Sequence, residues 1–170
     1  MVYPLFFHEV YKSYLWGGRR LAELGKVLPP DGVVAESWEI SGHPNGPSIV
    51  RNGPLSGMPL PDVLALWGAR LVGTFASPSD LRRFPLLVKL IDARDRLSVQ
   101  VHPDDDYARI HAGETGKSEM WYVVAADPGA SLVLGVRPGV GREAFRQALA
   151  AGTCEDLLQV VPVSAGDAVN

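Results

Sequence analysis

The stretch LSVQVHPDDD, residues 97–106, places side chains that can bind a metal or a substrate at alternate positions. Ser98, Gln100 and His102 alternate with three aliphatic residues, and Pro103 ends the run. Alternation of this kind is typical of a β-strand with one apolar and one polar face. The segment therefore predicts a strand that presents an amide and an imidazole side by side.

A second run, GKSEMWYVV, places Lys117, Glu119 and Trp121 on one face of the next candidate strand. If the two strands pair or face each other, Gln100, His102 and Glu119 can converge on one divalent ion. Imidazole combined with oxygen donors suits zinc or a neighbouring transition metal, although a primary amide is a poor ligand. The competing interpretation is a solvated polar face on which His102 makes an ordinary hydrogen bond.

Lys89 lies inside the apolar run PLLVKLID, with Leu87 and Ile91 on its own face. A lysine in such a strand is costly unless it faces a pocket. The alternative is that the amine reaches solvent at the edge of a sheet while its stem stays packed. From the residues alone, these two interpretations are equally open.

Other motifs favour ordinary turns over functional sites. The motif GVGREA (139–144) superficially matches a dinucleotide-binding turn, but no second parallel strand ending in an acid follows it. The acidic triplet 104–106 lacks the alternating spacing of a calcium loop and predicts the first turn of a helix. His111 and Glu114 can share a helical face, but Gly113 between them indicates that the helix ends there.

The 18 glycines and 14 prolines are spread along the chain and leave mostly short runs of other residues between them. Strands are predicted in VVAESWEI, PSIVRNG, PLLVKLID, LSVQVH, EMWYVVAA and ASLVLGV. Helical spacing over 59–73 and 141–152, with a weaker continuation from Thr153, predicts a helical layer from 59–73 and 141–160. We expect a mainly β fold, a sandwich or barrel with a few decorating helices, in one domain over 1–170.

The composition narrows the class of protein. With 46% hydrophobic and 21% charged residues, the chain is typical of a globular domain. Its net charge of −3 gives it no global basic field, which argues against nucleic acid as a partner. No apolar run reaches the length of a membrane span, and the N-terminus lacks the layout of a signal peptide. Because Cys154 is alone, we expect no internal disulfide and a cytoplasmic protein.

The last residues, VVPVSAGDAVN, begin like another strand after a turn and then stop. A β-fold that ends within a strand leaves an unpaired edge. We therefore expect the chain to be the front portion of a longer protein, incomplete at its C-terminus, and we expect self-association through the open sheet edge.

Several motifs together carry a family resemblance. PLLVKLIDARDRLSVQVHPDD followed by GKSEMWYVV strongly resembles the type I mannose-6-phosphate isomerases, zinc enzymes built on the cupin fold, and in particular their short bacterial branch. YLWGGRRL and ESWEISGHPNGPSIVRNGPLSGMPL support the resemblance, which covers essentially the whole chain. It implies a cupin-type jelly roll, a small sugar-phosphate substrate and one zinc ion per chain.

Carried over residue by residue, the resemblance implies that Gln100, His102 and Glu119 are zinc ligands. It also implies that Lys89 and Lys117 are active-site lysines. We expect both amines to point into the cleft that holds the metal, Lys117 because it shares a strand face with Glu119.

The resemblance extends to two substrate-binding positions and departs from the family at the end of the chain. Ser98 matches a residue near the sugar-phosphate site, and Trp16 lies in an N-terminal motif that helps line the cleft. The family's fourth zinc ligand, a histidine in a segment such as VPAGTVHA after GDA, has no counterpart, nor has its catalytic arginine. We expect weakened zinc affinity and little isomerase activity for residues 1–170 alone, with His111 the first candidate for a substitute ligand.

The implied reaction interconverts mannose 6-phosphate and fructose 6-phosphate through a cis-enediol intermediate. The residues do not identify the base, which is either a lysine beside zinc or a metal-bound water. Two other classes stay open: a non-catalytic cupin module that binds a sugar phosphate or metal, and an iron-dependent cupin dioxygenase. The dioxygenase requires His-x-His where this chain has Gln-x-His, which weakens that alternative.

Overall fold

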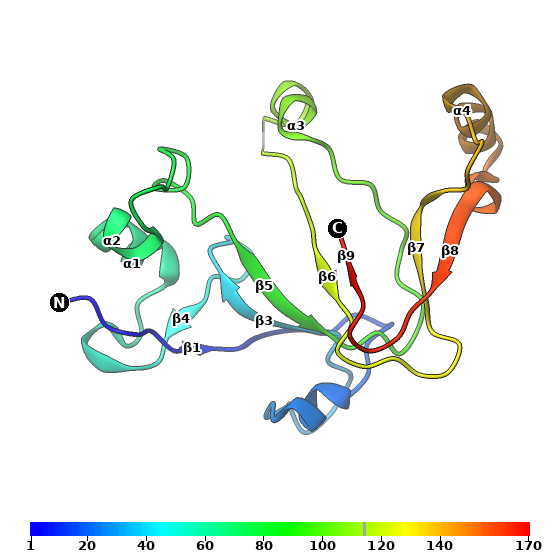
Figure 1. Ribbon diagram of the computed structural model, residues 1–170. Coiled ribbons are helices and arrows are strands. Elements are labelled where there is room, and N and C mark those ends of the chain that lie inside the picture. The colour runs from blue at the N-terminus through cyan, green and yellow to red at the C-terminus, as the bar shows by residue number, and fades with distance from the viewer. Residues whose placement is uncertain (114) are drawn as a thin grey trace. The chain divides into compact units, whose positions relative to one another are not determined.

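The computed structural model describes residues 1–113 and 115–170, and Figure 1 shows short strands with a few short helices. This confirms the mainly β prediction, whereas closure into a jelly roll stays a prediction. The chain divides into two compact units, Met1–Leu97 and Ser98–Asn170, which are described separately below. The prediction of one domain over 1–170 stays a prediction.

The first unit is built on antiparallel strands. β3 (Glu36–Ser41) is central, with β2 (Val10–Lys12) on one side and β5 (Leu87–Ile91) on the other. A separate antiparallel pair joins β1 (Phe7–His8) to β4 (Ile49–Val50). The predicted strands VVAESWEI and PLLVKLID are therefore confirmed, with β5 at an edge of its sheet, whereas PSIVRNG is a strand only over Ile49–Val50.

The helical spacing of 59–73 forms two short helices, α1 (Leu60–Trp67) and α2 (Ala69–Val72). They are separated by Gly68, whose φ of +53° is a left-handed conformation that favours glycine. Short 3₁₀ turns occur at Arg20–Leu24 and Gly53–Leu55. The predicted helical layer is thus confirmed here, interrupted at its glycine.

The apolar core of the described residues lies almost entirely in the first unit. α1 packs Val63 and Trp67 against Val50 of β4, and the N-terminal segment adds Tyr3 and Leu5 to this cluster. Buried hydrophobic residues of the first unit are Leu21, Val34, Ala35, Trp38, Val50, Leu60, Val63, Leu64 and Trp67. Among the described residues of the second unit, only Ala108 is a buried hydrophobic residue.

The second unit contains two separate antiparallel strand pairs and two helices. Its strands are β6 (Trp121–Tyr122), β7 (Ser131–Val136), β8 (Leu158–Pro162) and β9 (Ala168–Val169), paired as β6 with β9 and β7 with β8. α3 (Asp105–His111) begins at Asp104, whose Oδ1 accepts a hydrogen bond from the Tyr107 amide at 2.8 Å. The acidic triplet therefore starts a helix, as the sequence predicts.

α4 (Arg142–Ala151) confirms the predicted helix over 141–152, and Gly152 ends it in the left-handed conformation with a φ of +73°. The predicted continuation to residue 160 is wrong. Thr153 makes no capping hydrogen bond through its side chain, Cys154–Leu157 is a 3₁₀ turn, and strand β8 follows. The β-branched valines of LQVVP pair with β7, which outweighs the weak helical spacing.

The predicted strand LSVQVH is also wrong, because residues 97–102 form no strand. In the described part of the chain, no backbone hydrogen bond pairs this segment with a neighbour, and alternation alone does not make a strand without one. Likewise, EMWYVVAA is a strand only over Trp121–Tyr122. The two runs that carry the candidate ligands are mostly coil in Figure 1.

The fold settles one other sequence interpretation. The motif GVGREA runs from the turn after β7 into the first turn of α4, and β7 pairs antiparallel with β8, so the parallel strand arrangement of a dinucleotide-binding unit is not formed here. Within residues 1–113 and 115–170, no helix has the length and apolarity needed to cross a lipid bilayer.

Candidate functional site

Three of the predicted site residues meet in the second unit. His102 Nε2 lies 3.2 Å from Glu119 Oε2, and the ammonium of Lys117 lies 2.7 Å from Glu119 Oε1. Lys117 Nζ is also 3.3 Å from His102 Nε2. The structure therefore brings an imidazole, a carboxylate and an ammonium together from segments on either side of α3. We call these three residues the His–Lys–Glu cluster.

Ser98 and Gln100 are linked to each other upstream of this cluster. The Gln100 amide nitrogen donates a hydrogen bond to Ser98 Oγ at 3.1 Å, as expected for residues two apart in an extended segment. Because the nitrogen of the amide is turned toward Ser98, the amide oxygen is the atom that this orientation leaves for a cation. Both side chains are exposed, whereas His102 and Glu119 are half-buried.

Backbone contacts at the start of α3 bring the two segments together. The Lys117 amide donates to the Pro103 carbonyl at 3.1 Å, and the Gly116 amide donates to Asp105 Oδ1 at 2.8 Å. A Cβ at Gly116 would lie 2.5 Å from backbone atoms of both Asp104 and Asp105, closer than real atoms approach. Only glycine permits this approach, so Gly116 contributes to the cluster without touching a ligand.

The charges of the His–Lys–Glu cluster favour an ionised carboxylate. Burial raises the pKa of Glu119, but the hydrogen bond and charge of Lys117, with smaller contributions from His102 and the Trp121 indole, outweigh burial. The pKa of Glu119 therefore lies below its ordinary value. An ionised carboxylate is the form that binds a divalent cation.

The donor atoms fit a metal such as zinc. His102 Nε2 and Glu119 Oε2 lie 3.2 Å apart, and the Lys117 ammonium contacts both groups, at 3.3 Å from His102 Nε2 and 2.7 Å from Glu119 Oε1. Ligands around tetrahedral zinc, at bonds of about 2.0–2.1 Å, are roughly 3.3 Å apart. Among the described residues, no group of three or more His, Cys, Asp and Glu side chains is placed to hold a metal, and the Gln100 amide oxygen is the further donor that the sequence predicts.

In the first unit, Lys89 has a carboxylate partner. Its ammonium donates to Glu36 Oε1 at 3.0 Å, and the Trp38 indole donates to Glu36 Oε2 at 2.7 Å. The Lys89 side chain is 24% exposed and that of Glu36 is 7% exposed. The amine therefore faces a buried acid instead of reaching bulk solvent at the sheet edge. Sequence reasoning missed Glu36, for which the available signal was an acid two residues before a tryptophan in a predicted strand.

Trp16 is held in the first unit by its backbone and its ring. Its carbonyl accepts hydrogen bonds from the amides of Arg94 and Asp95, both at 3.0 Å, and its indole stacks on Tyr14 with ring centres 5.5 Å apart. Trp16 and Lys89 belong to the first unit and the His–Lys–Glu cluster to the second. That they share one cleft with the metal ligands stays a prediction.

The remaining histidines have other surroundings. His111, at the end of α3, packs against Tyr107 with ring centres 4.2 Å apart, and its role as a substitute ligand stays a prediction. The helix ends before Gly113, as predicted, and Glu114 lies outside the described residues. His43 Nδ1 accepts a hydrogen bond from the Asn45 amide.

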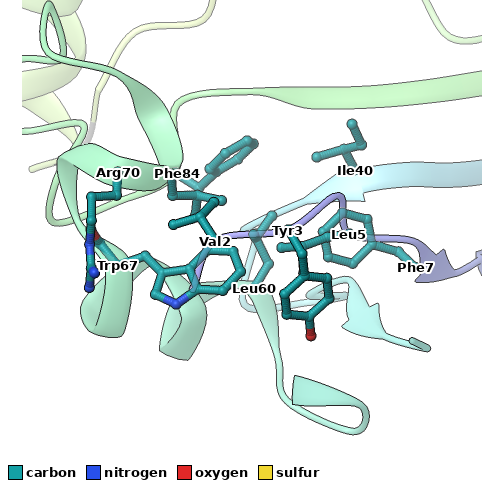
Figure 2. Close-up of a pocket in the computed structure, with 10 residues that line it drawn as sticks. Val2, Tyr3, Leu5, Phe7, Ile40, Leu60, Trp67, Arg70 and Phe84 are labelled. Carbon is teal, nitrogen blue, oxygen red and sulfur yellow. The ribbon is translucent and has the colours of Figure 1, made fainter. Parts of the chain in front are cut away.

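A cavity of about 280 Å³ in the first unit has the wrong chemistry for a sugar phosphate. Figure 2 shows its lining, which is apolar except for Tyr3 and Arg70. The Tyr3 hydroxyl is already used, donating to the Asn52 carbonyl and accepting from the Leu55 amide. Because polar ligands require several convergent polar groups, we interpret this cavity as an underfilled part of the core beside α1.

The fold and the His–Lys–Glu cluster together define a mainly β protein with a candidate cation-binding site. A family model described as the catalytic domain of type I phosphomannose isomerase matches residues 5–129. The chain belongs to the type I phosphomannose isomerases, which confirms the family resemblance of its motifs.

Individual relatives agree with this assignment. A mannose-6-phosphate isomerase of Streptococcus mutans serotype c is 46% identical over 168 residues, and GmuF of Bacillus subtilis is 42% identical; each match covers 98% of this chain and 51% of the relative. The crystal structure of the mannose 6-phosphate isomerase from Bacillus subtilis superimposes with a TM-score of 0.83 at 34% identity, over 97% of this chain and 51% of that one. The chain thus spans about half the length of the curated relatives it matches.

Proposed function

We propose that the protein acts as a zinc-dependent aldose–ketose isomerase that interconverts mannose 6-phosphate and fructose 6-phosphate. The observation that carries this proposal is the His–Lys–Glu cluster in a chain of this family, because it places metal-binding atoms beside an ammonium. We also propose that the chain forms part of a cupin-type jelly roll, for which its short antiparallel strands are the support.

The residues that would hold the metal are Gln100, His102 and Glu119. When bound, a zinc ion acts as a Lewis acid that draws electron density from a carbonyl or hydroxyl oxygen of the substrate. His102 supplies an imidazole nitrogen, Glu119 a carboxylate and Gln100 an amide oxygen, a mixed set that suits zinc.

The isomerisation moves protons without a net change in composition. A base removes the proton from C2 of mannose 6-phosphate, the freed electron pair forms the C1–C2 double bond, and O1 is protonated to give the cis-enediol. Proton return to C1 and loss of the O2 proton then generate the ketone at C2. Negative charge develops on O1 in the first half and on O2 in the second, so the site must stabilise both.

The lysines provide positive charge for these oxygens and for the phosphate. The ammonium of Lys117 carries three N–H donors and is anchored by Glu119, which leaves donor capacity for an oxyanion or for proton exchange with it. Lys89 is anchored by Glu36 in the same way. Its positive charge stabilises the negative charge of the enediolate or binds the phosphate. Ser98 and Trp16 are the proposed substrate contacts.

The test is metal analysis combined with a coupled isomerase assay on mannose 6-phosphate. Lys89→Met and Lys117→Met retain most of the packing of the lysine stem but delete the charge, so each should lower kcat/KM by roughly 100- to 1,000-fold in a folded protein. Lys26→Met is the matched control, because Lys26 is also an ammonium paired with carboxylates but has no proposed catalytic role. Unchanged kinetics in either test variant would remove that lysine from the mechanism.

One observation favours a second candidate, a non-catalytic module that binds a sugar phosphate or metal. The described residues of the cluster supply one imidazole and one carboxylate, fewer strong ligands than a catalytic zinc site usually has. Metal and sugar-phosphate binding without turnover, in this chain and in a full-length version alike, would support this module over the isomerase.

A further inference from the structure

Glu36 is a buried carboxylate on the central strand of the first unit, outside the set of residues that the sequence predicts for the site. It is 6% exposed, although acidic residues are seldom buried without partners. In the sheet register, Trp38 lies opposite Lys89 on β5, so Glu36 is diagonal to Lys89 on the same face. Lys12 of β2 lies opposite Glu36 on this face.

Both oxygens of this carboxylate are engaged. Oε1 accepts from Lys89 Nζ at 3.0 Å, and Oε2 accepts from Trp38 Nε1 at 2.7 Å. Trp38 is itself 8% exposed, and Lys12 Nζ lies 4.5 Å from the centre of its ring. Because a packed indole fixes one oxygen, the other oxygen is presented to Lys89 in one defined position.

Lys89 gains a restricted conformation from this arrangement. A lysine side chain has four rotatable bonds and otherwise samples many rotamers. An ionic hydrogen bond to a fixed, poorly solvated oxygen selects one of them, since charge-assisted hydrogen bonds are the stronger kind. The ammonium uses one donor on Glu36 and presents its other two donors to whatever occupies that face of the sheet.

We propose that Glu36, locked by Trp38, is a positioning residue that sets the place and orientation of the Lys89 ammonium for the sugar-phosphate substrate. Glu36 acts through Lys89 and does not itself contact the reacting atoms. This inference rests on the proposed function of Lys89, and the experiment below separates the two.

The first measurement is site-resolved acylation of lysine amines in the folded protein, followed by mass spectrometry. Glu36→Gln retains an acceptor for the Trp38 indole but deletes the charge, so Lys89 should be acylated several-fold faster while Lys26 is unaffected. The matched control is Glu39→Gln on the same strand, because Glu39 pairs with Lys26. In that variant the acylation of Lys26 should rise and that of Lys89 should stay constant.

The second measurement is steady-state kinetics with mannose 6-phosphate. Glu36→Gln should lower kcat by about 10- to 100-fold, should leave the metal content unchanged, and should have no further effect in a Lys89→Met background. Trp38→Phe, which deletes the indole N–H but retains an aromatic ring, should give a smaller loss in the same direction. It also keeps the proposal testable if Glu36→Gln folds poorly.

The outcomes distinguish the two proposals. Unchanged acylation of Lys89 in both Glu36→Gln and Trp38→Phe would overturn the positioning role, whatever happens to turnover. Lys89 could be acylated faster in Glu36→Gln while kcat stays normal in both Glu36→Gln and Lys89→Met. That result would retain the Glu36–Lys89 linkage but remove Lys89 from catalysis. Faster acylation with a loss of kcat that disappears in the Lys89→Met background is the result expected here.

Discussion

The two units of the chain hold their candidate functional residues by different means. In the first unit, Lys89 lies on a sheet strand and its partner Glu36 is buried next to Trp38. In the second unit, His102 and Glu119 lie on segments that are mostly coil, and Ala108 is the one buried hydrophobic residue among those described. The comparison shows that one ammonium is fixed by a packed sheet, whereas the candidate metal ligands are fixed by local contacts at the start of α3.

The exposure of the apolar residues beside the candidate ligands shows the same difference between the two units. Val99 is 42% exposed, Val101 is 88% exposed and Met120 is 71% exposed. These residues form the apolar side of the predicted alternation, and in the described structure they do not pack into a core. Self-association through an open sheet edge stays a prediction.

The largest expected difference between the units is in core packing. Leu64→Ala removes a side chain that is 2% exposed, so the free energy of unfolding should fall by about 2–5 kcal/mol. Leu134→Ala, the same change on half-buried β7 of the second unit, should cost about 1 kcal/mol. Urea unfolding monitored by circular dichroism measures both, and equal losses would contradict the difference in packing.

A smaller effect is expected from the turn that positions Lys117. Gly116→Ala introduces a Cβ that meets the backbone of Asp104 and Asp105 at 2.5 Å, so stability should fall by about 1–3 kcal/mol. Zinc affinity should fall as well, because the segments that carry His102 and Glu119 must separate. Gly141→Ala is the control, since its Cβ would meet nothing within 4 Å. Titration against a chromogenic chelator checks the affinity, and equal affinities in the two variants would count against the role of Gly116.

The smallest effect concerns the pH dependence of the first unit. Burial lowers the pKa of Lys26, but its hydrogen bonds and charge contacts with Glu39 and Glu9 outweigh burial, so the pKa lies above the ordinary value of 10.5. A folded-state pKa above the unfolded one means that the stabilisation is complete below pH 10.5 and is lost as the pH rises through the folded-state pKa.

The expected contribution of Lys26 is at most about 1 kcal/mol. Between neutral pH and pH 11, the urea midpoint of the protein should therefore fall more than that of Lys26→Met. Parallel pH profiles for the two proteins would show that the paired ammonium does not stabilise the fold.

The sequence predicted local features well. Asp104 caps α3, Gly152 ends α4, and the alternation of PLLVKLID forms β5, because each depends on residues close to one another in the chain. The meeting of His102 with Glu119 was also predicted, although the strand pairing proposed to bring it about is not what holds these residues. The contacts of Gly116 with the start of α3 do so instead.

Features that depend on distant partners could not be predicted. Whether LSVQVH forms a strand depends on a neighbouring strand with free hydrogen-bonding groups, and alternation carries no information about that neighbour. Glu36 was missed because an acid in a predicted strand is usually solvent-facing. Its pairing with Lys89 follows from the register of β3 with β5, which a single sequence does not reveal.

The central claim is that His102 and Glu119, together with Gln100, bind a divalent metal. The most direct test is the zinc content and zinc affinity of the protein, of His102→Ala and of His8→Ala, measured by elemental analysis and by competition with a chelator. His8 lies on β1 of the first unit and is a matched control. The account predicts that His102→Ala loses bound zinc while His8→Ala retains it with unchanged affinity. Zinc bound equally well by His102→Ala and the parent protein would contradict the account.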